Sequence, residues 1–141
     1  MLETIDFDQR RHLIEQIPCR VQVPLEWERL YEVEGYATTH LNEFRAGMRY
    51  RVLRRAALQL YGELPAFPRT TNLSGALVQD FSNRGMGLLY HEQLFPDERV
   101  RVLLPSISLD GTVVRCRRRG PECYELGLVL DRECRLRELL A

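Results

Sequence analysis

The sequence predicts a mainly β protein: a small six-stranded antiparallel β-barrel with a C-terminal α-helix and an N-terminal, partly helical extension. Six short runs of strand-forming residues, separated by turn signals, lie between residues 55 and 130. This pattern is typical of small closed barrels. Residues 131–140 carry an apolar stripe at helical spacing. The length of 141 residues suits one domain with an appendage.

The first part of the chain predicts two helices. Residues 8–17 form the first, with Asp8 as its cap and Pro18 as its stop. The second covers residues 24–34, because a proline suits the first helical position and Gly35 follows the last. A third, shorter helix is predicted at 39–44.

Charge divides the chain in the same way. Residues 1–44 have a net charge of −5, residues 45–119 have +7 and residues 120–141 have −2. The basic middle segment should attract an anion. We therefore predict an N-terminal extension at 1–44 and a barrel with its C-terminal helix at 45–141. The extension contains large aromatic residues to bury, which indicates an ordered appendage.

The barrel strands follow from alternating or continuous apolar runs bounded by glycine, proline and asparagine. Asp110-Gly111 indicates a tight turn or a bulge, and the arginine run 117–119 with Gly120-Pro121 indicates a hairpin loop. Asp131 is the expected cap of the last helix, whose stripe contains Leu136, Leu139 and Leu140. The predicted strands are 55–62, 74–80, 84–90, 98–104, 107–116 and 123–130.

Composition excludes several classes of protein. No apolar run approaches the roughly 18 residues that a membrane span needs, and the acidic N-terminus is no secretory signal. We therefore expect a cytoplasmic protein. The four cysteines lack zinc-site or redox spacing and are expected to be free thiols, although Cys116 and Cys123 could face each other across a hairpin. The three histidines are scattered, so no metal site is predicted.

One polar motif stands between two apolar runs. Asp80, Ser82 and Gly85 form an Asp-x-Ser-x-x-Gly sequence. If a strand ends here, alternation points the Asp80 and Ser82 side chains to the same side. Gly85 permits a tight turn, and Gly87 permits a close approach to the backbone. An ordinary β-turn would use the same residue types.

An arginine pair precedes the first predicted strand. Arg51 and Arg55 form an Arg-x-x-x-Arg sequence. Arg45/Arg49 and Arg115/Arg119 have the same spacing, so spacing alone carries no information in a chain whose 20 basic residues are all arginine. The position of Arg55 next to the strand is the informative feature.

This order of motifs resembles the PilZ domain family of bacterial cyclic di-GMP receptors, over about residues 49–130. The resemblance implies that Arg51 and Arg55 grip the guanines and phosphates of the ligand. It implies that Asp80 and Ser82 hydrogen-bond guanine or backbone, and that Gly85 shapes the loop. The chemistry agrees, because arginine donates in a fork to guanine O6 and N7 and also pairs with phosphate. No further cofactor is implied.

Three more residues are additional ligand-binding candidates. Arg54 and Arg84 could contact phosphate, against the alternative of solvated surface arginines. Tyr50 could stack on a base or be a core aromatic. The arginine-bearing segment is expected to be a mobile arm before the first strand, which orders on binding and so passes the signal on.

The function expected is a sensor without catalytic activity, which acts on a downstream protein and is compatible with a homodimer. The alternative is a barrel that ignores nucleotides and binds a protein through its strands and terminal helix. Nucleic-acid binding is less favoured, since the acidic ends would repel a long polyanion. An enzyme is disfavoured, because the sequence contains no nucleophile–base pair or metal cluster.

Overall fold

The computed structural model describes residues 7–24, 35–36, 50–62, 73–135 and 137–138. The helices predicted at 24–34 and 39–44 and the loop predicted at 63–72 therefore fall almost entirely outside the described residues. The elements are α1 (Phe7–Gln16), β1 (Gly35–Tyr36), β2 (Tyr50–Gly62), β3 (Leu73–Phe81), β4 (Gly85–Tyr90), β5 (Arg99–Leu103), β6 (Ser108–Gly120) and β7 (Cys123–Leu130).

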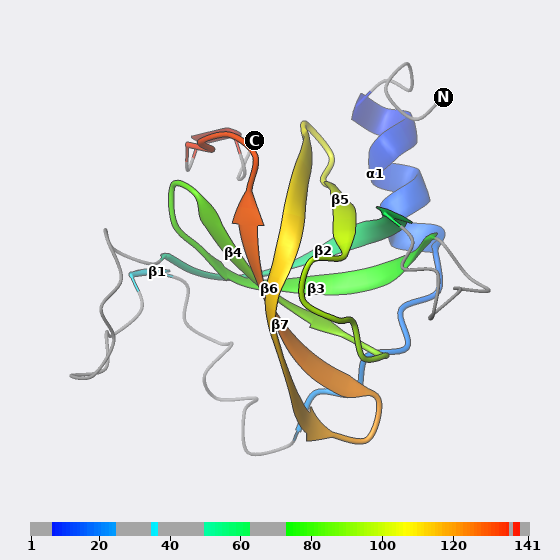
Figure 1. The fold of residues 1–141 in the computed structure, drawn as a ribbon. Coiled ribbons are helices and arrows are strands. Elements are labelled where there is room, and N and C mark those ends of the chain that lie inside the picture. The colour runs from blue at the N-terminus through cyan, green and yellow to red at the C-terminus, as the bar shows by residue number, and fades with distance from the viewer. Residues whose placement is uncertain (1–6, 25–34, 37–49, 63–72, 136, 139–141) are drawn as a thin grey trace.

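Six antiparallel strands form a closed barrel in the order β2-β3-β4-β7-β6-β5, with β5 returning to β2 (Figure 1). This confirms the predicted six-stranded antiparallel barrel. β2 closes the barrel by changing partner along its length. Residues 50–59 pair with β3, and residues 57–62 pair with β5. The two-residue strand β1 adds to the beginning of β2.

The barrel interior is filled by alternate residues of each strand. On β4, Met86, Leu88 and Tyr90 are fully buried in the main core cluster, so Gly85, Gly87 and Leu89 belong to the outer face. β7 alternates in the same way, with its even-numbered residues 126, 128 and 130 inside. This alternation fixes which residues of β4 and β7 can take part in an outer-face site.

The predicted first helix is confirmed as α1, although it begins at Phe7 and Asp8 lies inside its first turn. Ile14 and Ile17 form a second apolar cluster with Ala57 of β2 and Leu103 of β5, outside the barrel core. The residues after the helix, 17–24, here called the strap, then run along the barrel toward the β6–β7 hairpin (Figure 1).

Two backbone contacts fix the strap. The Gly75 amide of β3 donates to the Pro18 carbonyl at 2.8 Å, and the Gln22 amide donates to the Glu122 carbonyl at 3.1 Å. A Cβ on Gly75 would lie 2.6 Å from Cys19 Cβ, so only glycine lets the strap approach β3 this closely. The N-terminal segment is thus bound to the barrel at both ends of the strap.

The prediction of an arginine-bearing arm before the first strand is wrong. β2 begins at Tyr50, so Arg51, Arg54 and Arg55 lie within it. The strand extends to Tyr50 because Val52 is a strand-forming residue that is buried in the core, with 1% of its surface exposed. Arg55 is exposed, because an outward position of a strand accommodates arginine without burying its charge, whereas Arg54 is half-buried opposite Val78.

The predicted turn at Asp110-Gly111 and the arginine loop are also wrong. Asp110 and Gly111 pair in unbroken register with Arg101 and Val100. β6 continues through the arginine run to Gly120, because these residues pair with β7. The hairpin turn is Pro121-Glu122, and Glu122 has a φ of 50°. Cys116 lies opposite Leu126, not opposite Cys123, and all four cysteines are free.

The predicted C-terminal helix does not begin at Asp131. Residues 131–135 are not helical, and of the remainder only 137–138 are described, in helical conformation. Asp131 accepts from Arg99 on β5 at 2.7 Å and is not available as a cap. Cys134 is 1% exposed and its amide donates to Asn83. Burial raises the pKa of its thiol to about 11. The residues of the expected leucine stripe lie outside the described part.

Candidate functional site

The Asp-x-Ser-x-x-Gly motif forms the connection between β3 and β4. β3 ends at Phe81, so Ser82 lies in the turn, where its amide donates to the Gly85 carbonyl at 2.8 Å. The C-terminal segment supports the turn from outside. The Leu130 amide donates to the Arg84 carbonyl and the Cys134 amide donates to the Asn83 carbonyl, each at 2.8 Å. The motif is therefore held by backbone contacts on two sides.

Asp80 belongs to a line of directly opposite residues that crosses five strands. Arg51 of β2 lies opposite Asp80 of β3, and Asp80 lies opposite Gly87 of β4. Gly87 lies opposite Gly127 of β7, and Gly127 lies opposite Arg115 of β6. Directly opposite positions in antiparallel strands share a face, here the outer one. We call this set the cross-strand row: Arg51, Asp80, Gly87, Gly127 and Arg115.

The two glycines of the cross-strand row lie beneath charged groups. A Cβ on Gly87 would stand 2.8 Å from Asp80 Oδ1, and one on Gly127 would stand 3.1–3.3 Å from the Nε, Cζ and Nη2 atoms of Arg115. The Asp80 carboxylate therefore lies over β4 and the Arg115 guanidinium lies over β7. The close approach that Gly87 predicted is made by the motif's own aspartate.

The remaining motif arginine, Arg55, lies opposite Leu77 on β3. Its side chain is exposed, and its guanidinium donates a short hydrogen bond to the Ile17 carbonyl at the end of α1. A cation at a helix C-terminus is favourable because the last carbonyls have no partner within the helix. Arg55 thus connects the predicted binding strand to the helix and the strap.

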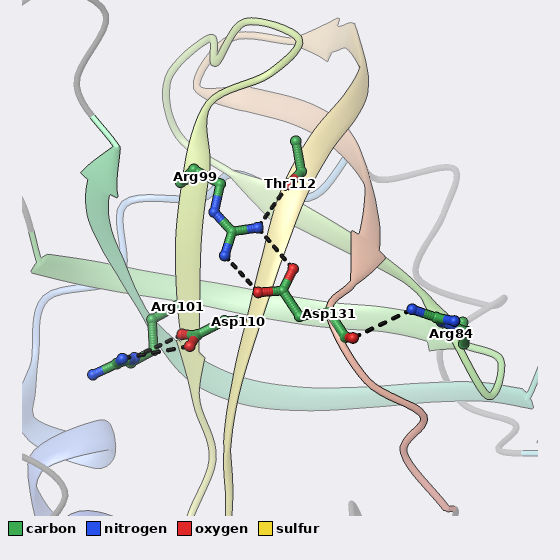
Figure 2. A network of polar contacts seen from close by, with 6 residues as sticks. All are labelled: Arg84, Arg99, Arg101, Asp110, Thr112 and Asp131. Atoms are coloured by element: carbon green, nitrogen blue, oxygen red, sulfur yellow. Dashed lines mark hydrogen bonds and ion pairs between the residues drawn. The ribbon is translucent and has the colours of Figure 1, made fainter.

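The three additional candidates, Arg84, Tyr50 and Arg54, contact neighbouring parts of the fold. Arg84 donates to the Asp131 carbonyl at 3.2 Å (Figure 2). The Tyr50 ring packs against Phe81 with centroids 6.2 Å apart, and both contact the main core. Arg54 is half-buried, and its side chain donates to the Leu53 carbonyl at 3.4 Å. The structure therefore brings Arg51, Asp80 and the 82–85 turn together, while Tyr50 lies with the core aromatics.

Next to the cross-strand row, Glu125 of β7 joins three strands. Gln79 Nε2 donates to one carboxylate oxygen at 2.8 Å and Arg119 Nη2 donates to the other at 2.7 Å. Burial raises the pKa of Glu125, but the hydrogen bonds from Gln79 and Arg119 and the charge of Arg115 outweigh it, so the pKa lies below its ordinary value. Glu125 is therefore a fixed anion.

A second group of arginines lies on β5. Arg99 donates to Thr112 Oγ1 at 2.8 Å and to the Asp131 carboxylate at 2.7 Å. Arg101 donates to Asp110 Oδ1 at 2.7 Å. Figure 2 shows both guanidinium groups directed at these carboxylates. Their hydrogen-bonding capacity is directed to structural partners within the fold.

Sequence reasoning missed Arg115 and Gly127 as neighbours of the motif. The signal available was a glycine inside a strand, which often marks a close approach. Among the residues that the structure describes, no group of three His, Cys, Asp or Glu is arranged for a metal ion. No helix in this part of the chain has the length and apolar character to cross a membrane.

Comparison with known proteins gives a family match that covers most of the chain. Residues 42–140 match the family model of the PilZ domain. No curated protein matches the chain, and no solved structure matches it. The match covers every strand of the barrel, including the cross-strand row.

Proposed function

The chain belongs to the PilZ domain family, and on that premise we propose that it is a cyclic di-GMP sensor without catalytic activity. PilZ domains are binding domains for this second messenger. The observation that carries the proposal is the pairing of Arg51 with Asp80 beside the Ser82–Gly85 turn. Arg51 of the first motif and Asp80 of the second therefore lie opposite each other at one end of the β2–β3 pair, as contact with a shared ligand requires.

The chemistry of these residues suits the ligand. The carboxylate of Asp80 accepts hydrogen bonds from N–H groups such as guanine N1–H and N2–H. Arg51 and Arg55 supply forked donors for guanine O6 and N7 or for phosphate. Ser82 can donate and accept beside them. Recognition thus combines one anionic acceptor for the base with cations for two phosphates.

We propose that Arg55 passes binding on to the N-terminal segment. Its guanidinium now donates to the Ile17 carbonyl, and a ligand phosphate is a stronger acceptor because the bond is charge-assisted on both sides. Capture of Arg55 by the ligand removes one contact that holds the end of α1. The helix is then held by the Ile14 and Ile17 cluster, by the hydrogen bond from Arg10 to Ser108 and by the Gly75–Pro18 hydrogen bond.

Calorimetric titration tests the binding proposal. We expect saturable binding of cyclic di-GMP, no comparable binding of GTP or cyclic di-AMP, and loss of binding in the Arg51→Ala/Arg55→Ala double variant. The stoichiometry then distinguishes a single ligand from an intercalated pair. Unchanged affinity in the double variant would remove this site assignment.

Limited trypsin digestion tests the coupling. Arg20 is exposed in the strap, so release of the strap should speed cleavage after Arg20. We expect faster cleavage with saturating cyclic di-GMP, and the same faster cleavage in Arg55→Gln without ligand. An Arg20→Gln variant identifies the band. Cleavage that ligand leaves unchanged or slows contradicts the coupling.

The output is proposed to be a downstream protein in the cytoplasm, where the second messenger is found, with a homodimer compatible with this use. The alternative is a barrel that binds a protein and ignores nucleotides. Val114 and Val129 favour it, being 52% and 47% exposed on the outer face. A ligand at 100 times its dissociation constant adds about 2.7 kcal/mol of stability. The absence of any thermal shift with cyclic di-GMP would favour the alternative.

A further inference from the structure

We propose that Arg115 is a further ligand-binding residue, whose guanidinium plane stacks on a guanine base of the dinucleotide that Asp80 holds. This inference rests on the proposed function and extends its site from β3 across the barrel face to β6. It adds a residue outside both sequence motifs.

The first support is the geometry of the guanidinium. Its Nε, Cζ and Nη2 atoms lie at nearly equal distances of 3.1–3.3 Å from the Cβ position of Gly127. A group that pointed at the glycine end-on would not give three similar distances, so the guanidinium lies across β7. Arg115 is exposed, and its other face is therefore turned toward solvent. A flat, exposed guanidinium is a surface on which a base can stack.

The second support is that three other arginines of β5 and β6 are already paired. Arg99, Arg101 and Arg119 each donate to a carboxylate. Within the described part of the chain, Arg115 makes no hydrogen bond or ion pair. Glu125 accepts from Gln79 and Arg119, and Arg115 acts on that carboxylate through its charge alone. Its donors and its face are available to a ligand.

The third support is the alignment with Asp80. The carboxylate over Gly87 and the guanidinium over Gly127 come from strands that are not neighbours, yet the two glycines are directly opposite. Opposite Cα atoms in such pairs are about 4.5–5.5 Å apart. A planar base whose edge is bound by Asp80 therefore reaches over Arg115. Gly127 allows this because any larger residue would hold the guanidinium higher above the sheet.

An apolar side chain lies beside this platform. Val129 follows Gly127 by two residues on the same face of β7, lies opposite Gly85, and is 47% exposed. A base stacked on Arg115 would cover part of this surface. The combination of a guanidinium plane and an apolar edge favours an aromatic base over a bare phosphate.

Calorimetric affinities of four proteins test the assignment: the wild type, Arg115→Ala, Arg115→Lys and Arg118→Ala. Arg118 is an exposed arginine of the same strand that lies opposite Tyr124, outside the cross-strand row, so its variant removes the same charge. We expect Arg115→Ala to bind cyclic di-GMP about tenfold more weakly, as loss of one stacking contact implies. Arg115→Lys should be nearly as weak, since lysine keeps the charge but has no plane. Arg118→Ala should bind like the wild type.

The outcomes separate this inference from the proposed function. If the wild type does not bind cyclic di-GMP, both fail. If the wild type binds and Arg115→Ala binds equally well, or Arg118→Ala is weakened as much as Arg115→Ala, only the assignment of Arg115 is overturned. Wild-type affinity in Arg115→Lys would overturn the stacking. Melting temperatures of the variants should match the wild type, because the Arg115 side chain is exposed.

Discussion

Two faces of this barrel carry arginines in opposite surroundings. On β5, Arg99 and Arg101 each donate to a carboxylate of the same fold, Asp131 and Asp110. On β6, Arg115 lies over a glycine without a hydrogen-bonded partner among the described residues. The difference teaches that arginine content does not locate a binding site here. What distinguishes Arg115 from Arg99 and Arg101 is that its guanidinium has no bound carboxylate among the described residues.

Glycine marks the same contrast. Gly87 and Gly127 lie beneath the flexible ends of charged side chains, whereas Gly111, which is buried opposite the core residue Val100, lies against the Val129 carbonyl. Gly87 and Gly127 accommodate charged side chains of the candidate site, whereas Gly111 accommodates the close packing of two strands. Substitutions of these two kinds of glycine should therefore change different measurable quantities.

The largest contrast is expected for ligand affinity. Arg51→Ala should weaken cyclic di-GMP binding about tenfold to a hundredfold, because a charge-assisted hydrogen bond contributes roughly 1.5–3 kcal/mol. Arg101→Ala removes the same charge from the paired face and should leave affinity unchanged. Titration calorimetry on both variants measures this. Equal losses of affinity in the two variants would mean that overall charge attracts the ligand and that neither face is the binding site.

This contrast was only partly predictable from the sequence. The barrel could be predicted, because its strands alternate and end at recognisable turn residues, as at Pro105. The motif residues could be predicted as well, because their spacing lies within a short stretch of sequence. The cross-strand row could not be predicted, because the register between strands distant in sequence depends on bulges. Such bulges lie between Val78 and Asp80 and between Val113 and Arg115.

The errors also have physical reasons. The arginine run 117–119 resembled a loop, yet pairing with β7 satisfies its backbone and leaves the charges outside. The C-terminal helix was predicted to begin at Asp131 as its cap, but Asp131 is bound to Arg99 and Cys134 is buried, with its amide bonded to Asn83 of the β3–β4 turn. Tertiary partners outweighed local preference at both places.

The next contrast concerns stability. A Cβ on Gly111 would lie 2.9 Å from the Val129 carbonyl oxygen, so Gly111→Ala forces backbone apart and should destabilise the fold by about 1–3 kcal/mol. Gly87→Ala meets only the end of the Asp80 side chain. It should change stability little and instead lower ligand affinity by displacing the carboxylate. Denaturant unfolding and titration of both variants test this pair. A strongly destabilised Gly87→Ala would contradict it.

A smaller effect is expected from pH on the paired face. The hydrogen bond from Arg99 holds the pKa of Asp131 below its ordinary value of 3.8. A lowered folded-state pKa gives stability that is present above that value and lost as pH falls through the folded pKa. The wild type should therefore exceed Asp131→Asn in stability at pH 7, by less than about 1 kcal/mol because water screens this partly exposed pair.

Thermal unfolding of the wild type and of Asp131→Asn between pH 7 and pH 2 measures the effect. The two curves should converge below about pH 4, as the carboxylate is protonated. A difference that persists undiminished at pH 2 would show that the Arg99–Asp131 charge pair is not its source. Ligand affinity at pH 7 should be the same in both proteins.

β2 changes partner along its length, and its two halves should therefore exchange amide hydrogens with solvent at different rates. Among the described residues, 57–59 pair with both β3 and β5, whereas 50–55 have β3 on one side and on the other only the two residues of β1. Less enclosed backbone opens more often. The half that opens first carries Arg51 and Arg55, so occupancy of the site would appear as slowed exchange at one end of a single strand.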